Sequence, residues 1–235
     1  MMMSKRINTM PRTPHFTLAA ALTLFAGAAV AQDWIEYINR EERFMINFPG
    51  VPEVTETTHV SAFEVEYPGK IYSVKTQRGD YSVTVIDYTE HVRRHRERND
   101  GTEANSGSTV PIMDVRASVA HAANMFRTRG GEVTYDAWVD VEKVDGHQLQ
   151  ITNPDQSRSF VAIFQHDARL YILEATVPRG YPPPILFQSA MGFLDEQGRR
   201  VRYQVDVNGQ RQRIDVRYEW IGEDPDATAE QIVVD

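Results

Sequence analysis

The chain has 235 residues, of which 25 are Lys or Arg and 33 are Asp or Glu, so its formal net charge at pH 7 is −8. An acidic chain is a poor candidate for a nucleic-acid-binding protein, because the phosphate backbone attracts basic surfaces. The sequence contains no cysteine, which excludes disulfides, cysteine nucleophiles and thiolate metal sites.

The first 31 residues have the pattern of a secretory signal peptide. Lys5, Arg6 and Arg12 form a basic leader, residues 16–31 are an apolar run, and small residues precede a cleavage point after Ala31. A retained membrane anchor is the alternative, but the run is shorter than the roughly 20 residues that span a bilayer. We therefore expect cleavage and export to the periplasm. The mature chain would carry 22 basic and 33 acidic residues, a formal charge of −11.

Five strands are predicted between residues 34 and 88. In the second strand, Phe44, Ile46 and Phe48 alternate and fall on one face, and a proline-rich turn follows. The Arg-Gly-Asp tripeptide at 78–80 spells a cell-adhesion motif, but we interpret it as a tight turn between strands. The predicted strands cover residues 34–38, 44–48, 53–60, 70–76 and 81–88.

Residues 90–100 form a basic segment that contains four arginines and two histidines. His91 and His95 are four residues apart, a spacing at which two helical histidines could bind one metal ion. No third histidine is close in sequence, and the arginines would repel a cation, so we interpret the segment as a solvated basic surface. Its simplest function would be docking to an acidic surface or an anionic headgroup. Residues 99–108 are expected to form an exposed, mobile loop.

The centre of the chain is predicted to form one long helix followed by antiparallel strands. Apolar residues repeat every three or four positions over 111–127, with His121 off this stripe and therefore exposed. Asp145-Gly146 is the expected turn of a hairpin. Residues 159–165 are apolar on both faces, which is typical of a central strand covered by helices on each side. A turn at Asp167-Ala168 leads into the next strand, and His166 before it is interpreted as a turn residue. The predicted strands cover 133–141, 147–152, 159–165 and 169–177.

The last part of the chain is predicted to contain a second helix and a hairpin. Residues 185–194 are apolar around most of a helix, which suits a core helix or a lipid-binding one. A C-terminal hairpin spans 196–222, with Asn208-Gly209 as a two-residue turn. That turn would pair Tyr203 with Ile214 and Arg202 with Asp215. Residues 223–235 are expected to be a loose acidic tail.

The order of these elements resembles the PsbP-like family, the bacterial exported relatives of the extrinsic photosystem II protein PsbP. The residues that carry the resemblance are F-x-I-x-F-P-x-x-P at 44–52, R-L-Y-I-L at 169–173 and A-M-G-F-L at 190–194. The resemblance covers residues 34–195 and implies an α+β fold, an antiparallel β-sheet flanked by helices in an α/β/α sandwich, over residues 32–195. The C-terminal hairpin would extend it. Relatives act as non-catalytic assembly or stabilising factors. No metal-binding histidine of the family maps onto His91, His121 or His166.

The sequence contains none of the common catalytic motifs, such as G-x-S-x-G, H-E-x-x-H or a P-loop. We therefore predict no enzyme activity, no catalytic residue, no cofactor and no metal. The main hypothesis is an exported, non-catalytic interaction or assembly factor that binds another protein of the cell envelope, without nucleic acid and without a membrane span after cleavage. The alternative is a periplasmic carrier of a small apolar or lipid-like ligand held between sheet and helix. The candidate partner-binding residues are Arg93, Arg94, Arg96, Arg98, Tyr218 and Trp220.

Overall fold

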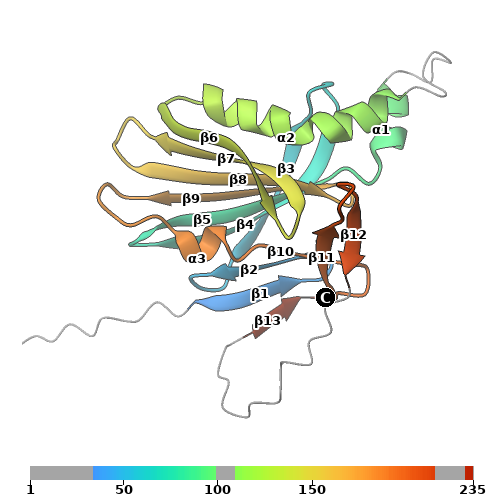
Figure 1. Ribbon diagram of the computed structural model, residues 1–235. Coiled ribbons are helices and arrows are strands. Elements are labelled where there is room, and N and C mark those ends of the chain that lie inside the picture. The colour runs from blue at the N-terminus through green and yellow to red at the C-terminus, as the bar shows by residue number, and fades with distance from the viewer. Residues whose placement is uncertain (1–33, 99–108, 215–230, 235) are drawn as a thin grey trace, which may run out of the picture. The chain divides into compact units, whose positions relative to one another are not determined.

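The computed structural model describes residues 34–98, 109–214 and 231–234. Over these residues the chain forms a seven-stranded and a six-stranded β-sheet together with one long helix (Figure 1). The predicted signal peptide at 1–31, the loop at 99–108, and Tyr218 and Trp220 lie outside the described residues. Within the described part of the chain, no helix is both long enough and apolar enough to cross a membrane.

The larger sheet has the strand order β3-β4-β5-β9-β8-β7-β6, and every neighbouring pair in it is antiparallel. Its fifth strand, β8, is buried on both faces over Phe160–Phe164, as predicted for a central strand. The strands are β3 (Glu53–Val60), β4 (Glu66–Thr76), β5 (Gly79–Asp87), β6 (Glu132–Val141), β7 (Val144–Thr152), β8 (Arg158–His166) and β9 (Arg169–Val177).

One face of this sheet is covered by the long helix α2 (Val110–Thr128). Its apolar stripe packs Val119 and Ala122 against Leu149, Val161 and Ile163 of the sheet, which confirms the predicted helix. A proline in its first turn and two glycines just after its end delimit the helix. The basic segment before α2, which was predicted to be a solvated surface, is not fully solvated. It forms a helix, α1 (His91–Arg98), whose His95 is buried.

The opposite face packs against the smaller sheet, whose order is β12-β11-β10-β2-β1-β13. The predicted apolar face Phe44, Ile46 and Phe48 is fully buried there, against residues such as Tyr171 and Leu173 of β9. The strands are β1 (Ile35–Asn39), β2 (Phe44–Phe48), β10 (Gly192–Leu194), β11 (Arg200–Val205), β12 (Arg211–Ile214) and β13 (Gln231–Val234).

The second helix predicted at 185–194 is wrong in extent. Only α3 (Ile185–Gln188) is helical, and Gly192–Leu194 is a strand that pairs with β2. A segment that is apolar on all sides suits a buried strand as well as a buried helix, and periodicity cannot separate the two over ten residues. The α+β class and the antiparallel sheet are confirmed. The face opposite α2, however, is covered by a second sheet together with α3 rather than by a helical layer.

The hairpin turn predicted at Asp145-Gly146 is also wrong. The turn is formed by Glu142 and Lys143, which both have positive φ, and Gly146 lies inside β7. A Cβ on Gly146 would lie 2.2 Å from Cδ1 of Phe164, so glycine serves close packing here rather than chain reversal. The turn at Asp167-Ala168 is confirmed, with positive φ at both residues.

The C-terminal hairpin exists, but its register is shifted by one residue from the prediction. Tyr203 pairs with Arg213, and Arg202 pairs with Ile214. The carboxylate of Asp206 accepts hydrogen bonds from the backbone N–H groups of Asn208 and Gln210, which closes a loop longer than two residues. Gly209 has a φ of 77° in that loop, as in a type I turn followed by a bulge. Within the tail that was expected to be loose, Gln231–Val234 forms β13, parallel to β1.

Candidate functional site

The most unusual group in the described structure is a buried carboxylate, Asp114, on the first turns of α2. Its side chain has no exposed surface. One oxygen, Oδ2, accepts hydrogen bonds from Ser61 Oγ at 2.8 Å and Tyr67 Oη at 3.0 Å, and His95 Nε2 lies 2.9 Å away. These groups come from the β3–β4 turn, β4 and α1. A single carboxylate therefore fastens α1, α2 and one end of the sheet together.

The arrangement contains Ser, His and Asp but does not have the geometry of a nucleophilic triad. In a triad the hydroxyl donates to the imidazole, which the carboxylate orients from its other side. Here Ser61 and His95 both bind the same carboxylate oxygen. Ser61 Oγ also accepts the backbone N–H groups of Phe63 and Val65, so its hydroxyl shapes the turn. This geometry supports a structural role for the cluster.

Three polar atoms around the Asp114 cluster have no hydrogen-bond partner among the described residues: Asp114 Oδ1, His59 Nε2 and Tyr88 Oη. The rings of His59 and Tyr88 are 6.2 Å apart, and Tyr88 stacks on Tyr67 at 4.0 Å. Burial, and then the positive charge that His121 can carry, lower the pKa of His59 to about 4. Burial also raises the pKa of Tyr88. Across the described residues, no three metal-ligating side chains are placed to hold an ion.

His59 also lines a cavity of about 280 Å³ between α2 and the larger sheet, which we call the helix pocket. It is also lined by Ser82 and Thr84 of β5, Ile172 of β9, and Ala122, Met125 and Phe126 of α2. Arg129 and Glu174 also line it and form an ion pair at 2.6 Å. The pocket therefore combines apolar, hydroxyl and paired charged side chains.

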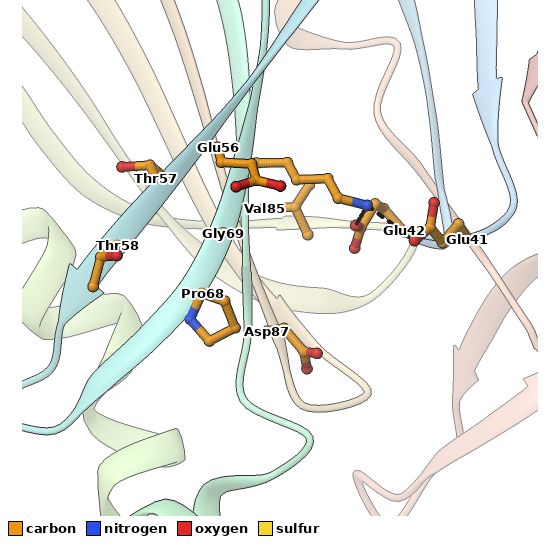
Figure 2. A pocket seen from close by; sticks show the side chains of 10 residues that line it. Glu41, Glu42, Glu56, Thr57, Thr58, Pro68, Gly69, Val85 and Asp87 are labelled. Atoms are coloured by element: carbon orange, nitrogen blue, oxygen red, sulfur yellow. Dashed lines mark hydrogen bonds and ion pairs between the residues drawn. The ribbon is translucent and has the colours of Figure 1, made fainter.

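A second cavity, of about 470 Å³, is acidic (Figure 2). Figure 2 shows Glu41 and Glu42 together on one side of it, with Glu56 and Asp87 apart from them. Lys70 binds both Glu41 and Glu42 at 2.9 Å, and its hydrogen bond to Glu42 raises its pKa. Two of the four carboxylates are thus already paired with a cation of the chain itself.

The arginines predicted to bind a partner all lie on α1, but most of them are engaged within the chain. Arg93 pairs with Glu90 at 2.8 Å and with Glu97 at 2.6 Å. Arg94 donates to the carbonyl of Glu66, and Arg98 binds the carbonyl of Phe63 and the carboxylate of Glu64. Arg96 is exposed and makes no ion pair within the described residues. The surface of α1 is therefore mixed in charge, and its role in binding stays a prediction.

Two histidines that the sequence placed at the surface or in a turn have structural partners. His121 Nε2 lies 3.0 Å from the carbonyl oxygen of Val60 and so connects α2 to β3. His166 is buried, stacks on Phe193 and lies 3.0 Å from the hydroxyl of Tyr203. His166 thus anchors the C-terminal hairpin to the larger sheet.

The Asp114 cluster was missed by sequence reasoning, although one signal pointed to it. Asp114 directly precedes Val115, a residue of the apolar stripe of α2, and it is buried beside that stripe together with Ser118 one turn later. A carboxylate at a buried position requires partners. Nothing in the sequence shows that Ser61, Tyr67 and His95 supply them, because they come from three other segments.

Two exposed aromatic side chains lie on β6, the last strand of the larger sheet, and they project from opposite faces because side chains alternate along a strand. Trp138 is 68% exposed and Tyr135 is 42% exposed. The indole ring of Trp138 packs edge-on against His147 at 4.9 Å, and His147 contacts Asp136, which pairs with Arg127 of α2. The exposed indole is therefore held by a chain of contacts that reaches the long helix.

Comparison with known proteins gives little further information. No protein-family model matches the chain, and no curated protein matches it. The solution structure of cyanobacterial PsbP (CyanoP) from Synechocystis sp. PCC 6803 is similar over 71% of this chain and 96% of that chain, with 9% sequence identity and a TM-score of 0.40. This likeness is too low to assign the chain to a family, so the PsbP-like resemblance stays a prediction from the sequence.

Proposed function

We propose that this protein is an exported, non-catalytic factor that binds another protein of the cell envelope, and that the outer edge of β6 is its docking surface. The observation that carries the proposal is that this edge is unpaired. Among the described residues, no strand pairs with the side of β6 that faces away from β7, and Trp138 and Tyr135 are exposed on the same strand.

An unpaired edge presents backbone N–H and C=O groups that an extended segment of a partner can complete as an additional strand. Exposed aromatic side chains provide most of the binding energy at many protein interfaces. The contacts of Trp138 with His147, and of Asp136 with Arg127, hold this edge in one conformation before binding. Such preorganisation reduces the entropy that is lost when the partner docks.

Two further features support the proposal. The only Ser, His and Asp side chains that the described structure gathers on one another, Ser61, His95 and Asp114, are arranged as a structural cluster without a nucleophile–base pair. The basic and then apolar leader that ends at Ala31 supports export. An N-terminus at Gln32 in protein recovered from the periplasm would establish it.

Site-specific photocrosslinking in the cells that make the protein tests the proposal. A photoreactive phenylalanine analogue at position 138 should capture a defined protein, whereas the same analogue at Val51, which is about as exposed and lies between β2 and β3, should not. Trp138→Ala should reduce affinity capture of that protein at least tenfold, and Val51→Ala should leave it unchanged. If joint replacement of Arg93, Arg94, Arg96 and Arg98 by alanine abolishes capture while Trp138→Ala does not, α1 is the docking surface and the assignment to β6 is wrong.

A further inference from the structure

The helix pocket arises because α2 covers only part of the larger sheet. The apolar stripe of α2 packs on β7, β8 and β9. Towards β3 the helix makes polar contacts instead, between His121 and Val60 and between Asp114 and Ser61. The C-terminal half of α2 then spans the cavity of about 280 Å³, whose floor is formed by β5 and β9.

The pocket continues along the part of the same sheet face that α2 does not cover. A neighbouring hollow of about 350 Å³ shares Ser82 and Glu174 with it and reaches β4. A molecule bound under α2 could therefore enter and leave along this face without disturbing the packed stripe of the helix.

The charges that line the helix pocket are balanced. Arg129 pairs with Glu174 at 2.6 Å and also lies over the ring of Phe126 at 4.6 Å. His59 is only 7% exposed and, with a pKa of about 4, is neutral at pH 7. A charged ligand would lose part of its hydration in this pocket without meeting an uncompensated opposite charge. The electrostatics therefore favour an uncharged ligand.

The remaining lining residues are apolar on one side and hydroxylated on the other. Met125 and Phe126 of the helix face Ser82 and Thr84 of β5, with Ile172 beside them. Neither hydroxyl makes a side-chain hydrogen bond to another of the described residues, so both can bind a ligand. Methionine adapts its shape to an apolar guest. The volume is close to the lower limit of about 300 Å³ for ligand pockets.

We propose that the helix pocket is a binding site for a small, uncharged amphipathic molecule, with its apolar part against Met125, Phe126 and Ile172 and its polar group on the hydroxyls of Ser82 and Thr84. This site goes beyond the protein-binding function and does not depend on it, because it shares no residue with the exposed edge of β6. It also differs from a lipid site at residues 185–194, which are not a continuous helix.

A matched pair of fluorescent probes tests both the site and the charge rule. N-phenyl-1-naphthylamine is uncharged, and 8-anilinonaphthalene-1-sulfonate has the same ring system with an added sulfonate. The mature protein should bind the uncharged probe saturably, with one molecule per chain, and should bind the sulfonated probe at least tenfold more weakly. An absence of saturable binding, or equal affinity for the two probes, would overturn the proposal.

Matched substitutions locate the bound probe. Thr84→Phe fills the pocket from its floor and should weaken binding of the uncharged probe at least tenfold. Thr58→Phe adds the same ring on β3 but lines the acidic cavity instead, so it should leave the affinity within twofold of the original. Thermal unfolding of both variants checks that each is folded.

A measurement on the unaltered chain keeps the test independent of folding defects. In a methyl NMR spectrum, the uncharged probe should shift the resonances of Met125 and Ile172 and leave that of the fully buried Met191 in place. Unchanged Met125 and Ile172 resonances at saturating probe would place the probe elsewhere, for example on the exposed side chains of α3, and would contradict the proposed site.

Discussion

At the scale of single residues, Asp114 makes the contacts on which the helical side of the fold depends. Its Oδ2 binds Ser61, Tyr67 and His95. All four side chains are buried, so solvent cannot replace the carboxylate as the partner of these groups. A buried carboxylate loses its hydration on folding, and charge-assisted hydrogen bonds offset that loss. The net result is a strong dependence of the fold on one side chain.

We therefore expect Asp114→Ala to lower the free energy of unfolding by about 3 kcal/mol or more. The substitution leaves three buried donors unsatisfied, and each costs roughly 1–3 kcal/mol. Urea denaturation measures the change. Asp140→Ala is the control, because within the described part of the chain the carboxylate of Asp140 forms an ion pair only with the exposed Lys143, and its loss should cost less than about 1 kcal/mol. Equal stabilities for the two variants would show that the buried carboxylate is not stabilising.

His59 should make stability depend on pH. Its pKa is about 4 in the folded chain and 6.5 when unperturbed, because burial and His121 disfavour its charged form more than Asp114 favours it. The unfolded chain therefore binds a proton first as the pH falls. The stability that neutral His59 contributes is complete above pH 6.5 and is lost progressively between 6.5 and about 4.

Comparison with His59→Gln isolates this contribution. Between pH 7 and pH 4.5 the original chain should lose about 2 kcal/mol more stability than the variant, because glutamine does not titrate. An NMR titration of the His59 ring should give a midpoint near pH 4. A midpoint near 6.5, or parallel pH profiles for the two chains, would show that the imidazole is accessible to water and protons.

At the scale of elements, the sequence predicts the features that impose a period on a segment, and it fails where particular side-chain contacts decide the outcome. The stripe of α2 and the alternation of Phe44, Ile46 and Phe48 were recognisable because burial of one face imposes a period on the sequence. In contrast, the Asn208-Gly209 turn was assigned the wrong register because the carboxylate of Asp206 closes a longer loop.

The candidate site shows the same limit more strongly. The arginines of α1 were conspicuous in the sequence, yet most of them are bound within the chain. Glu90 and Glu97 are local partners of Arg93, whereas the carbonyl of Glu66 and the carboxylate of Glu64 come from a distant segment. The helix pocket could not be predicted, because its walls come from four elements that are distant in sequence. The sequence did suggest a ligand held between sheet and helix, but on account of the apolar segment 185–194, which does not line this pocket.

Gly146 provides a test of the revised strand assignment. An added Cβ would lie 2.2 Å from Cδ1 of Phe164 and 2.5 Å from the carbonyl oxygen of Ile163, so Gly146→Ala should destabilise the fold by about 2–3 kcal/mol through overpacking. Gly209→Ala is the matched control. Its Cβ would meet nothing within 4 Å, and only its φ of 77° is unfavourable, which costs about 1 kcal/mol.

A double-mutant cycle separates the steric cause from any backbone effect at Gly146. In a chain that also carries Phe164→Leu, the smaller side chain leaves room for the new Cβ, so Gly146→Ala should cost at least about 1 kcal/mol less than in the original chain. Thermal or urea unfolding of the four chains provides the coupling energy. If Gly146 were a turn residue, as the sequence suggested, no coupling with Phe164 would be measured.

At the scale of the whole described structure, one hydrophobic core joins the two sheets. Residues of β1, β2 and β10 interleave with residues of β5, β8 and β9 in a single buried cluster. Phe193 is at its centre, with its ring 5.4 Å from Tyr171 and 6.1 Å from Phe164 of the larger sheet, while its backbone pairs with Phe44 of the smaller one. The short strand β10 therefore contributes more to the core than its length suggests.

This shared core predicts that the two sheets unfold together. Phe193→Ala should lower stability by about 3–5 kcal/mol, since it removes a fully buried ring. Native-state hydrogen exchange should show the amides of β2 and of β9 losing protection by the same amount, because neither sheet keeps its buried face without the other. Leu186→Ala, at an exposed position of α3, should change neither. Faster exchange in β2 with unchanged exchange in β9 would mean that the smaller sheet opens alone, and that the core at Phe193 covers the larger sheet without stabilising it.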